Sequence, residues 1–165
     1  MAHGCRDRQL NTIDDFESFA LSTYKSANDF YNVVDHSMDL LTQYPDAVLT
    51  NIAFSIELFL KSIFYKQTHM KCFKNGNRGP EIHNLSQIFH RLPDEIQKEI
   101  TRLHPCSNIT KDRFEISLEH IGDIYTVFRY SNEKTFLSCN LQFVVEFLLV
   151  LKYFSDKLFS VGNTE

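Results

Sequence analysis

The sequence lacks tryptophan altogether and has only 5 glycines and 4 prolines among its 165 residues. A fold built from β-strands needs many tight turns, and glycine and proline supply most of them. Their scarcity therefore argues against an all-β domain. The 4 cysteines are far apart and form no C-x-x-C pair, which disfavours both a disulfide framework and a zinc site. We expect reduced thiols in a cytoplasmic protein.

Long hydrophobic runs are also missing. The most apolar stretch, Leu141 to Leu151, spans about 11 residues and contains Gln142 and Glu146, whereas a membrane-spanning helix needs about 20. The first twelve residues are polar and do not have the pattern of a signal peptide, so we expect residues 1–12 to form a flexible tail. These features predict no membrane contact.

An excess of positive charge is absent as well. The formal net charge is −4, so the chain as a whole does not attract nucleic acid, although a local basic groove, or one formed by dimerisation, is compatible with this value. Phenylalanine, with 15 residues, and tyrosine, with 7, are abundant instead. Phenylalanine fills a core without needing a hydrogen-bond partner, so this excess predicts a well-packed interior.

Helical periodicity accounts for most of the chain. Apolar residues recur every three or four positions, and Pro45, Pro93 and Pro105 interrupt the pattern. The spacing predicts four long helices, over residues 13–44, 46–68, 110–129 and 139–159, and two short helices, over residues 84–92 and 93–104. Residues 70–82 are polar and somewhat basic, which predicts a mobile loop. Because each apolar stripe must be buried against another, we expect an all-α helical bundle that forms a single domain over residues 1–165.

Three polar sites stand out against this apolar background. The first site consists of Glu57 and Lys61, the only charged residues between Asp46 and Lys66. Their i,i+4 spacing places the two side chains next to each other on one helix face. The three sites are Glu57 with Lys61 in the second helix, His83 with Asn84 and Leu85 at the start of the third, and Arg129 with Tyr130 and Glu133 where the predicted helix over residues 110–129 ends.

This order of sites resembles the HEPN superfamily of prokaryotic helical domains. Many HEPN-like proteins have a Glu-x-x-x-Lys helix, then a His-x-Leu helix start, then a late Arg-Tyr, and the resemblance covers roughly residues 15–160. It implies a helical bundle, frequent homodimerisation, a cognate antitoxin or defence protein as partner, and a role in toxin–antitoxin or antiviral systems.

Many members of this family are metal-independent ribonucleases, whose signature is an Arg followed by a His after four to six residues. The Arg would steady a scissile phosphate and the His would transfer a proton. No His follows Arg129 at this spacing. Arg78 with His83, and Arg113 with His120, match it elsewhere, and the second pair lies on one helix face about 10 Å apart along the axis.

Each site also has a purely structural interpretation. Glu57 and Lys61 form a buried ion pair that Arg129 extends, or Lys61 and Arg129 bind a phosphate. His83 braces the helix that follows it, or transfers a proton near bound RNA or nucleotide. Arg129 and Tyr130 tie two helices together, or present a guanidinium and a stacking ring to a ligand. The basic loop around Arg78 is solvated, or it contacts nucleic acid.

The sequence favours a HEPN-like protein of a prokaryotic conflict or defence system that binds or cleaves RNA, or binds a nucleotide, as a homodimer. The competing function is a non-enzymatic helical module for protein interaction or regulation. His69 and Cys72 have the spacing of half a metal site, but no second pair follows, so we expect neither a metal nor a cofactor. The candidate catalytic residues are His83, Arg129, His120 and Arg113, and the candidate ligand-binding residues are Glu57, Lys61, Arg78, Tyr130 and Glu133.

Overall fold

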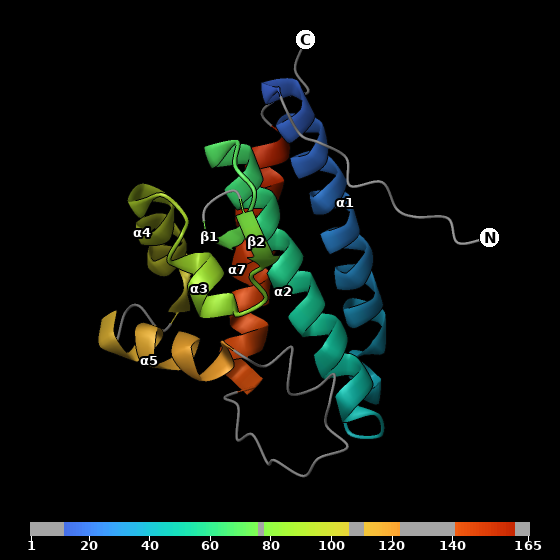
Figure 1. Cartoon of the computed structure of the whole chain (residues 1–165). Coiled ribbons are helices and arrows are strands. Elements are labelled where there is room, and N and C mark those ends of the chain that lie inside the picture. Colours follow the sequence, from blue (N-terminus) through green and yellow to red (C-terminus); the bar gives the residue numbers. More distant parts are fainter. Residues whose placement is uncertain (1–11, 76–77, 106–110, 123–140, 161–165) are drawn as a thin grey trace, which may run out of the picture.

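The predicted all-α class is confirmed. The computed structural model describes residues 12–75, 78–105, 111–122 and 141–160, and helices account for most of them (Figure 1). The helices of the described residues are α1 (Ile13–Ser37), α2 (Pro45–Thr68), α3 (Leu85–Phe89), α4 (Asp94–Leu103), α5 (Lys111–Ile121) and α7 (Leu141–Ser160), with a short 3-10 turn over Met38–Leu40.

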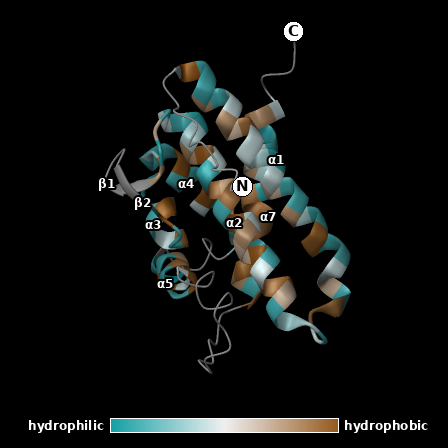
Figure 2. Ribbon diagram, turned by 45° about the vertical axis from the view of Figure 1, so that its right-hand side comes forward, coloured by the Kyte–Doolittle hydropathy of each residue, from teal (hydrophilic) through white to brown (hydrophobic). Residues whose placement is uncertain are grey.

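Helix α2 is the centre of the molecule. Pro45 is its first residue, where a missing N–H costs nothing, and more than half of its residues are buried. Helices α1 and α7 flank it, and its apolar residues face both of them (Figure 2). Helix α2 is long and apolar enough to cross a membrane, but 67% of its most apolar window is buried inside the fold.

Helix α1 ends earlier than its apolar pattern predicts. It begins at a capping box in which Thr12 and Asp15 bond each other's backbone N–H groups. It ends at Ser37, whose hydroxyl donates to the carbonyl of Val33 at 2.6 Å, and not at residue 44. The following 3-10 turn keeps Met38 facing the core, which is why the apolar spacing continues past the end of the helix.

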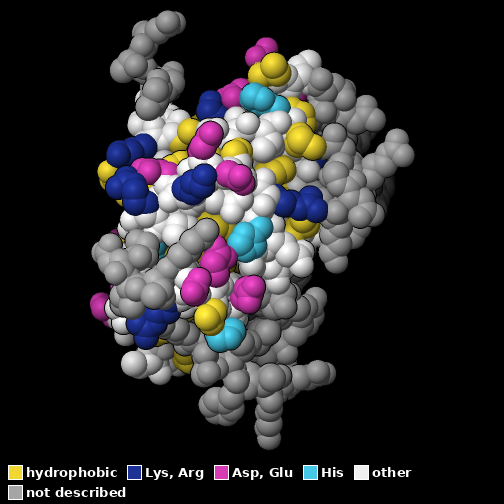
Figure 3. Space-filling model, turned by 90° about the vertical axis from the view of Figure 1, so that its left-hand side faces the viewer, with side chains coloured by type: hydrophobic (Ala, Val, Ile, Leu, Met, Phe, Trp, Pro, Cys, Tyr) yellow, Lys and Arg dark blue, Asp and Glu magenta, His cyan; other side chains and the backbone are white. Residues whose placement is uncertain are grey.

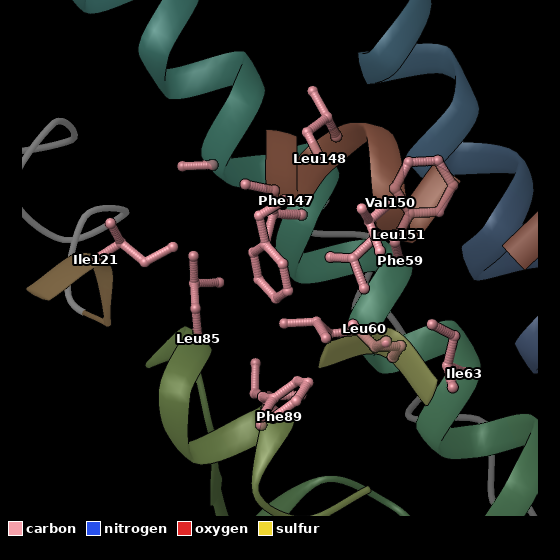
Figure 4. Packing of buried hydrophobic residues seen from close by; sticks show 14 of the residues in the cluster. Phe59, Leu60, Ile63, Leu85, Phe89, Ile121, Phe147, Leu148, Val150 and Leu151 are labelled. Carbon is pink, nitrogen blue, oxygen red and sulfur yellow. The ribbon is translucent and has the colours of Figure 1, made fainter. Parts of the chain in front are cut away.

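A second layer, formed by α3, α4 and α5, covers one side of α2 and α7. Figure 4 shows Leu85 and Phe89 of α3 pointing at Phe147 of α7 and Leu60 of α2. Helix α5 was expected to run to residue 129, but it ends at Ile121, and Gly122 lies in a turn. The carbonyl of Gly122 accepts a hydrogen bond from the N–H of Leu85 at 2.8 Å. The end of α5 is therefore bonded to the start of α3.

Residues 70–82, expected to be a loop, contain a small antiparallel hairpin. Strand β1 (Phe73–Asn75) pairs with β2 (Arg78–Glu81), with an irregularity in the register. The backbone of Ile82 donates to the carbonyl of Cys72 at 3.1 Å and closes the base of the hairpin. Both of these residues are buried, so the base is anchored in the core while the strands extend from it.

Candidate functional site

The charged residues of α2 lie in a buried cluster. The Nζ atom of Lys61 is 2.8 Å from Oε1 of Glu57, one helical turn earlier, and 3.0 Å from Oε2 of Glu81 in β2. The side chains of Lys61 and Glu57 are only 5% and 6% exposed, whereas that of Glu81 is 46% exposed. Lys61 therefore has one buried carboxylate partner and one that reaches solvent.

His83 joins the same cluster from the segment after β2. Its Nδ1 lies 2.9 Å from Oε1 of Glu57, and its side chain is 48% exposed. A carboxylate can only accept a hydrogen bond, so this contact assigns the proton to Nδ1 and leaves Nε2 as the basic ring nitrogen. Glu57 thus bridges a buried ammonium and a half-exposed imidazole.

One oxygen of Glu57 is not satisfied within this cluster. Oε1 accepts from both Lys61 and His83, but Oε2 is buried and has no hydrogen-bond partner in the described part of the chain. A buried carboxylate oxygen without a donor carries a desolvation cost. An unsatisfied buried polar atom of this kind calls for an explanation, and a functional role is one that is often found.

Burial and nearby carboxylates together shift the pKa values of this region. For Lys61, burial alone would lower the pKa, but the charges and hydrogen bonds of Glu57 and Glu81 outweigh it and raise the pKa above its usual value. Burial raises the pKa of the nearby Cys72 thiol to about 11. Burial, together with the surrounding carboxylates, also raises the pKa of Tyr65. Near neutral pH the cluster thus has a charged Lys61 beside a neutral thiol and a neutral phenol.

The backbone around His83 is held on both sides. Ile82 and Leu85 are buried, and each donates its backbone N–H to a neighbouring segment. Asn84 is the N-cap of α3, and its side chain accepts from the N–H of Gln87 at 2.9 Å. His83 is therefore presented from a fixed backbone, directly before a capped helix, as the sequence analysis expected for the start of this helix.

The structure brings some of the predicted site residues together and separates others. Glu57, Lys61 and His83 meet, as described above. Arg113 and His120 are both exposed on α5, and within the described residues neither makes a hydrogen bond or an ion pair. Their side chains take no part in the cluster. The remaining candidates, Arg129, Tyr130, Glu133 and the side chain of Arg78, lie outside the described part of the chain.

Glu81 was not among the residues predicted from the sequence. It lies 20 residues from Lys61, and only the hairpin brings the two together. A signal for this hairpin was present, because Gly76-Asn77, which stands between the paired residues Asn75 and Arg78, is one of the dipeptides typical of a two-residue hairpin turn. Interpreting residues 70–82 as a mobile loop gave no reason to place a carboxylate at this position.

His69 and Cys72, which have the spacing of half a metal site, lie in different surroundings. His69 adopts a left-handed backbone conformation and contacts Glu17, with Nε2 3.1 Å from Oε1, whereas Cys72 is buried at the base of the hairpin. Among the described residues, no three His, Cys, Asp or Glu side chains gather closely enough to hold a metal ion.

The face with the second layer shows mixed charge. In Figure 3 its histidines lie among acidic side chains, and lysines and arginines are scattered between them. The described side chains of this face make no broad basic surface of the kind that binds a polyanion by charge alone.

The chain matches no known protein-family profile, no curated protein and no solved structure.

Proposed function

We propose that this chain is a HEPN-like protein of a prokaryotic conflict or defence system that binds RNA or a nucleotide in front of His83. One observation carries the proposal: Glu57 and Lys61, both buried on the apolar helix α2, meet the half-exposed side chains of Glu81 and His83. Such a combination of a buried charge network and an accessible titratable group is typical of functional sites.

The chemistry that this geometry supports is proton transfer by His83. Its Nδ1 donates to Glu57, so Nε2 is the nitrogen that can accept a proton from a bound hydroxyl. Glu57 is a positioning residue, since it fixes the ring orientation and the tautomer. This arrangement needs no metal ion, which agrees with the metal-independent ribonuclease activity that the HEPN resemblance implies.

Phosphate binding needs a cation that Lys61 does not supply in this arrangement. Two carboxylates and one ammonium give Glu57, Glu81 and Lys61 a net charge of −1 when His83 is neutral. A phosphate would therefore meet a negative site. The proposal keeps Arg129, and the stacking ring of Tyr130, as the predicted phosphate and base contacts of the ligand.

The test uses purified protein, a single-stranded RNA substrate and EDTA. We expect cleavage by the wild type and its loss in His83→Ala, with the melting temperature nearly unchanged because this side chain is half exposed. Arg113→Ala and His120→Ala are matched controls, since both remove an exposed side chain of α5 outside the cluster, and both should keep full activity. If RNA is neither bound nor cut, or if His120→Ala abolishes cutting while His83→Ala does not, the proposal fails.

A second function is favoured by a separate surface. A groove of about 240 Å³ is lined by Leu103, Pro105, Leu149, Val150 and Tyr153, together with Glu146. Leu149 and Tyr153 are each 49% exposed and are four residues apart on α7, so two large apolar side chains reach solvent next to each other. This groove fits a non-enzymatic module that binds a cognate protein. Loss of a co-purifying partner in Leu149→Glu, with RNA cleavage absent throughout, would favour this alternative over the first.

A further inference from the structure

We propose that Glu81 occupies, on Lys61, the place of a phosphate-type anion, so that a nucleotide or RNA phosphate binds this cluster by displacing Glu81. The inference rests on the proposed function for the location of the ligand. It adds a second phosphate contact, the ammonium of Lys61, and names the side chain that occupies this position in the free protein.

The two partners of Lys61 differ in how easily they can leave. Glu57 is on the same helix, 6% exposed, and cannot reach water without disturbing α2. Glu81 is 46% exposed, so its carboxylate can turn into solvent by a change of side-chain rotamer. A buried ammonium that loses this second partner must find another anion or bear a desolvation cost.

The hairpin can release Glu81 without unfolding. The neighbouring residue Ile82 is buried and its N–H is bonded to the carbonyl of Cys72, so the backbone at the base of the hairpin stays in place. Only the side chain of Glu81 needs to move. The space that it leaves lies between Lys61 and solvent, on the side from which the hairpin carboxylate now approaches.

The charge balance identifies the class of ligand. With Glu81 turned away, Lys61 and Glu57 neutralise each other, and a protonated His83 brings the site to a charge of +1. A phosphodiester carries the same charge as the carboxylate that it replaces, and a phosphate monoester such as that of AMP carries up to one further negative charge near neutral pH. Both accept the same hydrogen bond from Nζ. A neutral or cationic ligand would leave Lys61 without its second partner.

The experiment measures binding of AMP, by calorimetry, to the wild type and to Glu81→Gln. Removing the competing carboxylate should tighten AMP binding about fivefold, the size expected for a partly exposed ion pair. Glu99→Gln is the matched control, because Glu99 is 44% exposed and paired to Arg102 on α4, away from Lys61. It removes the same charge and should leave the affinity unchanged. A six-nucleotide single-stranded RNA, titrated in parallel, tells a free nucleotide from an RNA phosphate as the source.

A substitution of Lys61 is the second part of the test. Lys61→Met should abolish AMP binding, and if this variant does not fold, the double variant Glu57→Gln/Lys61→Met removes both buried charges and serves instead. The inference is overturned if Glu81→Gln binds AMP no more tightly than the wild type, if Glu99→Gln has an equal effect, or if binding survives without Lys61. Tighter AMP binding in Glu81→Gln without any RNA cleavage would sustain the inference while ending the ribonuclease proposal. RNA cleavage that depends on His83 but not on Glu81 would support the ribonuclease proposal and end the inference about Glu81.

Discussion

At the scale of single residues, burial decides what an ion pair contributes. Lys61 and Glu57 form a pair whose side chains are nearly inaccessible, whereas Lys66 and Glu17 form a pair that is about one third exposed. Truncating one member of a buried pair leaves its partner charged in a medium that solvates it poorly, while truncating an exposed member returns the other to water. Lys61 and Lys66 both lie on α2, so the two pairs compare a buried and a partly exposed lysine on the same helix.

We expect Lys61→Met to lower the free energy of unfolding by about 3–5 kcal/mol, because Glu57 would stay buried without its ammonium. Lys66→Met should cost about 1 kcal/mol or less. Urea denaturation followed by circular dichroism measures both. Similar losses in the two variants would mean that burial does not govern these pairs.

Local spacing made part of this site predictable. The contact between Glu57 and Lys61 follows from their i,i+4 positions within one helix. The contact between His83 and Glu57 joins residues 26 positions apart, so it depends on how the chain folds back on α2. Glu81 could not be found in this way. Its contact depends on the register of a hairpin with an irregularity, which sequence periodicity does not encode.

At the scale of elements, the junction between α5 and α3 depends on a glycine. A Cβ atom placed on Gly122 would lie 2.8 Å from Nδ2 and 3.1 Å from Oδ1 of Asn84. The same Oδ1 caps α3 by accepting from Gln87. The end of one helix therefore approaches the cap of another so closely that no side chain fits between them.

We expect Gly122→Ala to displace the Asn84 side chain and to cost about 1 kcal/mol, the usual value of a helix N-cap. The free energies of unfolding of Gly122→Ala, Asn84→Ala and the double variant form the test. Since the single changes disable the same cap, the double variant should be no less stable than Asn84→Ala alone. Fully additive losses would show that Gly122 is needed for a reason other than this contact.

The ends of elements were less predictable than the elements themselves. The apolar spacing located α1 and α2 and their buried faces, because burial follows the helical period. It could not detect that α1 ends at Ser37 or that α5 ends before Gly122, since the 3-10 turn keeps the apolar spacing and the tertiary bond from Leu85 to Gly122 is not local.

At the scale of the whole molecule, aromatic rings join the two layers. Phe89 of α3 and Phe114 of α5 contact Phe147 of α7, with ring centroids 6.1 and 5.9 Å apart, and Phe143 stacks on Phe147 at 5.8 Å. The abundance of phenylalanine predicted a well-filled interior, and this cluster is where many of these rings gather. It holds the second layer against α7.

His104, which ends α4, is buried inside this aromatic cluster. It is 1% exposed, and its ring lies 4.7 Å from that of Phe143 and 5.3 Å from that of Phe114. Burial lowers the pKa of His104 below its usual value of 6.5, although a hydrogen bond to the backbone of Phe143 and the charge of Glu146 act in the opposite direction. The neutral ring is therefore the form that fits between the layers.

This lowered pKa makes the stability of the whole fold depend on pH. Above pH 6.5 the ring is neutral in both the folded and the unfolded chain, so its contribution is fully present. As the pH falls below 6.5 the unfolded chain binds a proton first, and stability decreases by up to about 1.4 kcal/mol per pH unit until the folded form is protonated as well. We expect urea denaturation between pH 7.5 and 5.5 to show a smaller loss in His104→Gln than in the wild type. His36→Gln, which removes an exposed histidine of α1, should behave as the wild type does, and equal losses in all three proteins would exclude His104 as the origin of the effect.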